Sequence, residues 1–172
     1  MKLTVITPVF RTEYLDIISK TIPSDVDWIC VYDDKEIKLP VNAKGILIDK
    51  VQSSWGVFKV NVALNEIKDG HIYVLDDDTI LHPDFSILLH LDNRFDFIYF
   101  NQCWKNGKKR VGGIVKEREI DIGNYIVSRE LIGNTFLKEG EIPDGTWAVE
   151  LYKKCKKPLY LNKFFSIYNY LR

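Results

Sequence analysis

In the sequence GHIYVLDDDT, residues 70–79, three consecutive carboxylates directly follow a short apolar run. The run at 72–75 is typical of a buried strand. Alternate side chains of an extended chain point the same way, so Asp76 and Asp78 can converge while Asp77 points elsewhere. Adjacent carboxylates repel one another unless a positive group neutralises them, and their hard oxygens suit Mg²⁺ or Mn²⁺ together with a substrate diphosphate. The stretch therefore predicts a metal and diphosphate site, with a solvated turn as the alternative interpretation.

Upstream of this stretch, apolar runs alternate with segments of helical spacing. The first run is β-branched and ends at Pro8, which indicates a buried strand and a following loop. Thr12 can then cap a helix, and a second helix ends where Asp69 and Gly70 close its apolar pattern. The predicted elements are strands at 3–9, 28–32, 45–48 and 72–75, and helices at 12–22 and 57–67.

Downstream of the carboxylates, the pattern indicates a hairpin among mixed elements. Pro83 suits the first turn of a helix, because its missing amide has no partner to lose there. Asn106 and Gly107 both tolerate positive φ, which favours a tight turn between two strands. The predicted elements are helices at 83–91, 129–137 and 147–154, and strands at 95–103, 110–115, 120–127 and 159–167.

This order of elements predicts an α/β fold with a mixed, mostly parallel sheet flanked by helices. A length of 172 residues with 46% hydrophobic composition suits a single domain spanning 1–172. Ligands of such sheets bind beyond the carboxyl ends of the strands. The loop at 8–12, Asp33, Asp34 and the acidic stretch at 76–79 all follow predicted strands, so we expect them to share one edge.

The charge balance argues against a global attraction to nucleic acid or to an anionic membrane. Lys plus Arg equals Asp plus Glu at 24 each, so a charged ligand has to be recognised locally. The amino-terminal segment is too short and too interrupted to be a signal peptide or a spanning helix. We therefore expect a cytoplasmic protein with no membrane span and no nucleic-acid partner.

Four motifs in one order resemble the family 2 type of GT-A glycosyltransferases, over about residues 3–84. Members of that family have a Thr-Pro-Val-aromatic loop after the first strand, an acidic residue after the second, an asparagine shortly after a glycine on a helix, and a Gly-x-aromatic strand leading into Leu-Asp-x-Asp. The matching positions are Thr7, Pro8, Val9, Phe10 and Arg11, then Asp33 or Asp34, then Gly56 and Asn61, then the stretch at 70–78.

The resemblance implies a single GT-A-like domain whose donor half is about 1–84 and whose acceptor-side half is about 95–172. It implies that the loop after the first strand embraces the nucleotide and that Asp33 or Asp34 reads the base. By the same resemblance Asp76 contacts the ribose, and Asp78, with Asp76, holds Mn²⁺ or Mg²⁺ against the diphosphate. The residues expected to bind the nucleotide sugar are Thr7, Pro8, Phe10, Arg11, Asp33, Asp34, Asn61, Asp76 and Asp77.

A catalytic base is expected near the start of a late helix, where family members carry a Glu-Asp pair. This chain has EIPDGTW at 141–147 and no adjacent pair, so Asp144 is the first candidate and Glu141 the second. The acceptor hydroxyl has to lose its proton as the anomeric carbon loses a diphosphate, so one carboxylate within reach acts as general base. The resemblance implies inversion of the anomeric configuration.

The expected function is transfer of a sugar from a nucleoside diphosphate sugar to a saccharide or another hydroxyl acceptor. A phosphatase of the haloacid dehalogenase type also uses Asp-x-Asp after a strand, but there the fifth motif residue is normally Thr or Val, whereas Ile80 stands here. A nucleotidyltransferase requires a glycine-rich loop after the first strand, and none is present. A non-catalytic nucleotide-sugar-binding module remains an alternative, with a partner transferase domain supplying the acceptor site.

Overall fold

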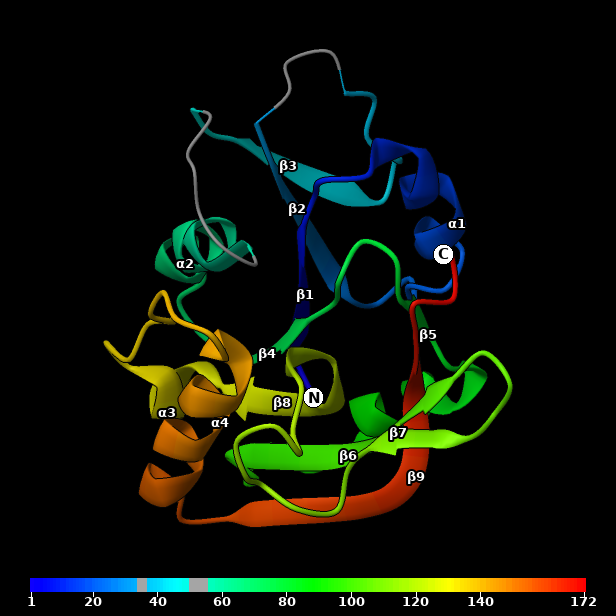
Figure 1. Ribbon diagram of the computed structural model, residues 1–172. Coiled ribbons are helices and arrows are strands. Elements are labelled where there is room, and N and C mark those ends of the chain that lie inside the picture. Colours follow the sequence, from blue (N-terminus) through cyan, green and yellow to red (C-terminus); the bar gives the residue numbers. More distant parts are fainter. Residues whose placement is uncertain (34–36, 50–55) are drawn as a thin grey trace.

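The computed structural model describes residues 1–33, 37–49 and 56–172. One sheet runs through the molecule, with helices against both of its faces (Figure 1). The amino-terminal elements are β1 (Leu3–Pro8), a 3₁₀ turn (Thr12–Tyr14), α1 (Leu15–Ser19), β2 (Asp27–Tyr32), β3 (Ala43–Leu47), α2 (Val57–Glu66) and β4 (His71–Val74). The remaining elements are β5 (Ile80–Leu81), a 3₁₀ helix (Pro83–His90), β6 (Phe97–Trp104), β7 (Lys109–Val111), a 3₁₀ turn (Ile122–Asn124), β8 (Tyr125–Ser128), α3 (Arg129–Ile132), α4 (Pro143–Lys154) and β9 (Pro158–Tyr168).

The strand order in the described residues is β3-β2-β1-β4-β8-β6-β9-β5, with β7 paired to the far part of β6. The strands β1 to β4 are parallel to one another, β8 runs antiparallel between β4 and β6, and β9 lies parallel to β6. Parallel ladders hold most of the paired residues. The predicted α/β fold with a mixed, mostly parallel sheet flanked by helices is confirmed.

The central strand β1 is buried along its whole length, because both faces of the sheet are covered there. Val5 packs into the core that includes α1 and the 3₁₀ helix after β5, while Ile6 packs into the core under α2 and α4. A strand covered on both faces is mostly apolar, and here Leu3, Val5 and Ile6 are buried together with the polar Thr4. The carboxyl ends of β1 and β4 are thereby fixed side by side, in register from Leu3 opposite His71.

Several predicted elements differ from the observed ones: the strand expected at 110–115 ends at Val111, and the helix expected at 147–154 begins at Pro143. The helix after β1 begins with a 3₁₀ turn whose N-cap is Arg11, so Thr12 is not its cap. The strand expected at 120–127 begins only at Tyr125, because Asp121 caps a 3₁₀ turn over the three preceding residues. The helix expected at 129–137 ends at Ile132, where Gly133 turns the backbone to a φ of 51°.

The carboxyl-terminal part of the chain closes the sheet on the side of β6. The strand β9 pairs with β6 over the whole length of β6. On its other edge, near its carboxyl end, β9 pairs with the short β5 (Figure 1). The short β7 turns back along β6 and ends at Val111; at the next residue, Gly112, an added Cβ would lie 2.6 Å from the Cα of Asn101. This close return places Arg110, on β7, at the same end of the sheet as the loops after β1 and β4. Among the described helices, none has the length and apolar character needed to cross a bilayer.

Candidate active site

A pocket of about 490 Å³ lies beyond the carboxyl ends of β1 and β4, at the edge where the sequence predicted a site. Its walls come from both halves of the chain: the loops after β1 and β4, the strand β7, the start of α4, and the segment that follows β9. The lining residues are Pro8, Phe10, Arg11, Asp76, Asp77, Asp78, Arg110, Asp121, Glu141, Ile142, Pro143, Asp144, Tyr168, Asn169 and Arg172.

Asp77 ties the loop after β1 to the loop after β4. One of its carboxylate oxygens accepts hydrogen bonds from the backbone N–H groups of Phe10 at 2.5 Å and Arg11 at 2.6 Å. Its other oxygen lies 3.1 Å from the Arg11 guanidinium, and the side chain is almost fully buried. Hydrogen bonds to an ionised acceptor are among the stronger ones, so Asp77 fixes the loop after β1 rather than standing free for a ligand.

Asp78 is buried and is already surrounded by cations. It forms an ion pair with the Arg11 guanidinium and lies 2.6 Å from Nε of Arg172. The amide of Asn169, oriented to donate, places its nitrogen 3.2 Å from each oxygen of Asp78. The carboxylate of Asp78 therefore faces a position that accommodates positive charge.

Asp76 faces two further carboxylates across the pocket, those of Asp121 and Asp144. Burial raises the pKa of Asp76 well above its ordinary value, and the nearby charges of Asp121 and Asp144 raise it further. Burial, with a second contribution from Asp121, raises the pKa of Asp144 to about 7. The three groups concentrate negative charge that a cation in the pocket would neutralise.

Arg110 is the counter-charge to this acidic group. Its guanidinium donates to Asp121 at 2.8 Å and to the side-chain oxygen of Gln102 at 2.6 Å, and it lies 3.6 Å from the ring centroid of Tyr168. Arg110 lowers the pKa of Asp144, against the larger effects of burial and of Asp121. Asp121 was not predicted as a site residue because it lies within a predicted strand, although its Asp-x-x-Asn spacing to Asn124 is typical of a cap.

Asp144 lies in the first turn of α4, just inside the pocket wall, whereas Glu141 precedes the helix and has a 92% exposed side chain. Pro143 at the start of α4 ends the preceding loop and fixes where the helix begins. A helix amino terminus favours the ionised form of a carboxylate, but the burial of Asp144 outweighs that effect here. Of the two predicted base candidates, Asp144 is the one held by the fold.

Of the other predicted nucleotide-binding residues, Phe10 and Asp33 lie beside the pocket, whereas Thr7 lies in the core. Phe10 is 55% exposed beside the pocket, with the ammonium of Lys59 3.9 Å from its ring centroid, and the same ammonium lies 3.2 Å from Asp33. Thr7 accepts a hydrogen bond from the Trp28 indole inside the core.

Asn61 lies away from the pocket residues just described. Its amide exchanges two hydrogen bonds with the backbone of Leu137, at 2.9 and 3.0 Å, so this side chain joins α2 to the loop before α4. Asp34, the alternative to Asp33 as the base-reading residue, lies outside the described residues.

The carboxylates present fit a divalent cation. Asp76 and Asp78 are alternate residues on one loop. Burial, and after it the neighbouring carboxylates, raise the pKa of Asp76, and Asp78 already pairs with cationic groups. Within the described parts of the chain, no three His, Cys, Asp or Glu side chains are arranged as a metal cage. Two carboxylates with water and a substrate diphosphate are the usual way in which Mg²⁺ is held.

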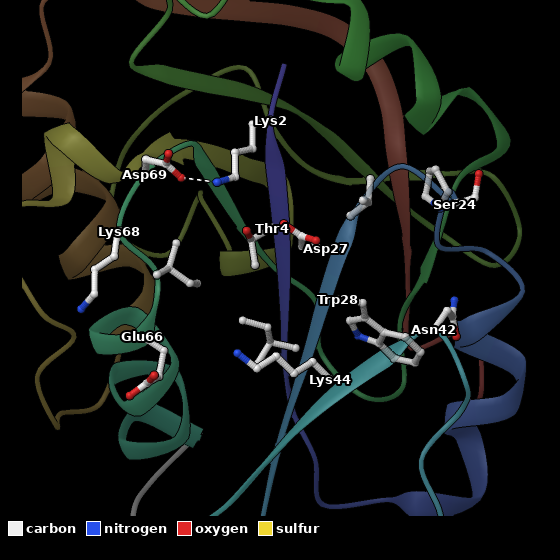
Figure 2. Close-up of a pocket in the computed structure, with 14 residues that line it drawn as sticks. Lys2, Thr4, Ser24, Asp27, Trp28, Asn42, Lys44, Glu66, Lys68 and Asp69 are labelled. Atoms are coloured by element: carbon white, nitrogen blue, oxygen red, sulfur yellow. Dashed lines mark hydrogen bonds and ion pairs between the residues drawn. The ribbon is translucent and has the colours of Figure 1, made fainter.

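A second hollow, of about 650 Å³, lies at the amino ends of β1 and β2 (Figure 2). Its walls carry opposite charges that are spread out, and the ion pair drawn there joins Lys2 to Asp69. Asp69 is 71% exposed, so its carboxylate is hydrated. The chemistry-bearing groups thus converge at the opposite end of the strands.

Comparison with known proteins identifies the fold. No family model and no curated protein matches the sequence. The crystal structure of S. aureus TarS 1-349 matches with a TM-score of 0.72 and 17% identity, over 97% of this chain and 60% of that one. The same protein in complex with UDP-GlcNAc matches with a TM-score of 0.71 and 16% identity, over 97% and 58%. The mannosyltransferase PcManGT from Pyrobaculum calidifontis, in complex with GDP-Man and Mn²⁺, matches with a TM-score of 0.64 and 13% identity, over 94% and 55%.

The chain therefore has the GT-A-like fold that its sequence motifs predicted. It spans no more than 60% of the length of the TarS chains that it matches. At identities of 12 to 17% the similarity extends to the arrangement of strands and helices.

We expect replacement of Asp77 by Ala to lower the free energy of unfolding by on the order of 2–4 kcal/mol, because two backbone amides and a guanidinium lose a buried acceptor. Urea denaturation measures the change. Asp69→Ala is the matched control, since that carboxylate pairs with Lys2 in solvent, and it should change stability little. Equal losses in the two variants would contradict the anchoring role of Asp77.

We expect Asp144→Asn to stabilise the protein, and to do so more at pH 8 than at pH 4.5. The pKa of Asp144 is about 7 in the folded protein and near 4 when unfolded, so between these values the folded state binds more protons and stability falls as the pH rises. The gain from the variant should grow by on the order of 1–3 kcal/mol across this window. Thermal unfolding at the two pH values measures it; a gain independent of pH would show that Asp144 is not a buried acid.

Proposed function

We propose that this protein is a glycosyltransferase that moves a sugar from a nucleoside diphosphate sugar to a hydroxyl acceptor, with inversion. The observation that carries the proposal is the convergence, in one pocket, of the Phe10–Arg11 loop, the carboxylates of Asp76 and Asp78, and Asp144 from the other half of the chain. The GT-A-like fold supports it, because solved structures similar to this chain include complexes with UDP-GlcNAc and with GDP-Man.

In this proposal the donor lies along the carboxyl ends of β1 and β4. The base rests against the exposed ring of Phe10, close to Asp33, whose carboxylate is held by the buried ammonium of Lys59. The ribose lies at Asp76 and the diphosphate at Asp78. Thr7 and Asn61 act through the fold, since their side chains hold the core and the α2 contact.

Asp144 is the general base in this scheme. It accepts the proton of the acceptor hydroxyl while that oxygen attacks the anomeric carbon from the face opposite the departing diphosphate, which inverts the configuration. A pKa of about 7 suits this task, because about half of the base is then ionised at neutral pH and the ionised form is more basic than an ordinary aspartate. The Asp121–Arg110 pair positions the wall opposite Asp144.

Asp78 and Asp76 would hold a Mn²⁺ or Mg²⁺ ion, which when bound stabilises the negative charge that develops on the leaving diphosphate. Arg110 contributes positive charge to the same pocket. The acceptor approaches from the side of α4 and of residues 95–172, and residues 1–84 supply the donor contacts, both within a single domain. A partner transferase domain is a further source of acceptor contacts.

Calorimetric titration with UDP, GDP, TDP and CDP, with and without Mn²⁺, tests the donor site. We expect one nucleotide to bind about tenfold or more tightly when Mn²⁺ is present, a difference of about 1.4 kcal/mol. Asp78→Asn should lose the metal-dependent part of the binding, whereas Asp69→Asn, at the other end of the strands, should keep it. If no nucleotide binds in either condition, or if Asp78→Asn keeps the metal effect, the donor site is not where we place it.

A further inference from the structure

The segment after β9 folds back over the pocket and reaches the loop after β4. Asn169 has a φ of 47°, a left-handed conformation that asparagine adopts more readily than most residues, and it reverses the chain. The backbone N–H of Leu171 then donates to the carbonyl of Asp78 at 3.2 Å. Figure 1 shows this end of the chain rising past β5 to the level of the loop that joins β4 to β5.

The two arginines on Asp78 are held differently. Arg11 is anchored twice more, by its backbone N–H on Asp77 and by its guanidinium 3.1 Å from the other oxygen of Asp77. The side chain of Arg172 is 55% exposed, and its guanidinium contacts Asp78, with Nε 2.6 Å from a carboxylate oxygen. An exposed arginine loses little by leaving a single carboxylate, so Arg172 is the partner of Asp78 that can be displaced.

The oxygens of Asp78 have little room for another ligand while Arg172 stays. Two carboxylate oxygens offer about four lone-pair positions. Arg11, Arg172 and Asn169 approach them together, and the hydroxyl of Thr79 lies 3.4 Å from Oδ1. A divalent cation bound to Asp78 would also repel the guanidinium beside it.

We propose that Arg172 is a positioning residue that occupies the cation position of Asp78 in the metal-free protein and leaves when a divalent cation binds. Metal binding and closure of the segment at 169–172 are then coupled, and the coupling is reciprocal: Arg172 weakens metal binding, and metal releases the segment. The inference rests on the metal site of the proposed function. In the metal-free protein, the half-exposed Arg172 then helps to neutralise the buried carboxylate of Asp78.

The test is the affinity for Mn²⁺ alone, without any nucleotide, measured by calorimetry and by the electron paramagnetic resonance signal of free Mn²⁺. Arg172→Gln should bind Mn²⁺ about five- to tenfold more tightly than the wild type. The variant should fold, because Asp78 keeps Arg11 and Asn169. Lys105→Gln is the matched control: it removes one positive charge that contacts Tyr170 in the same segment but does not touch Asp78, so its Mn²⁺ affinity should equal that of the wild type.

Hydrogen exchange supplies a readout of the segment itself. Saturating Mn²⁺ should speed exchange at the Leu171 amide in the wild type, and Arg172→Gln should exchange fast there without metal. Unchanged Mn²⁺ affinity in Arg172→Gln, or a gain that Lys105→Gln shares, would overturn the role of Arg172. A failure of the proposed metal site looks different, because then neither the wild type nor Arg172→Gln binds Mn²⁺ above the level of Asp78→Asn.

Discussion

The carboxylate of Asp77 is the constraint on which the site depends. It accepts hydrogen bonds from the backbone N–H groups of Phe10 and Arg11, and so holds the loop after β1 against the loop after β4. Parallel pairing of β1 with β4 brings these two strand ends together, but pairing alone leaves the loops beyond them undefined. The middle carboxylate of the acidic stretch thus acts within the fold, and we propose that its two neighbours, Asp76 and Asp78, are the ones that take ligands.

The charges of the pocket follow from this arrangement. Asp76, Asp121 and Asp144 face one another, and burial with mutual repulsion raises the pKa of both Asp76 and Asp144. Arg110 offsets part of this charge, while Asp78 is neutralised by arginines from two ends of the chain. A site that keeps its acids protonated or paired when empty is suited to a ligand that brings a cation with it.

The fold of the first half of the chain was predictable from the sequence because its signals are local. A continuous apolar run identifies a buried strand, and carboxylates that follow such runs meet at one sheet edge. The alternation of side chains along an extended chain predicted that Asp77 points away from Asp76 and Asp78. The spacing of residues could not predict that its partners are backbone amides of the loop after β1.

The second half depends on contacts between residues far apart, which local patterns do not report. Asp121 and Arg110 meet only because β7 turns back along β6, and the segment at 169–172 reaches Asp78 only after β9 has run alongside β6. The helix expected at 129–137 was wrong because Gly133 ends it. The family resemblance predicted that Asn61 binds the nucleotide, whereas in the structure its side chain forms hydrogen bonds with the backbone of Leu137.

The most direct test of the central claim is the release of free nucleoside diphosphate from UDP, GDP, TDP and CDP sugars, followed by chromatography in the presence of Mn²⁺. The proposed mechanism requires release from one nucleotide class, its loss in Asp144→Asn despite retained donor binding, and no hydrolysis of a simple phosphate ester. Hydrolysis of the phosphate ester without release from any sugar donor would contradict a glycosyltransferase and favour a phosphatase.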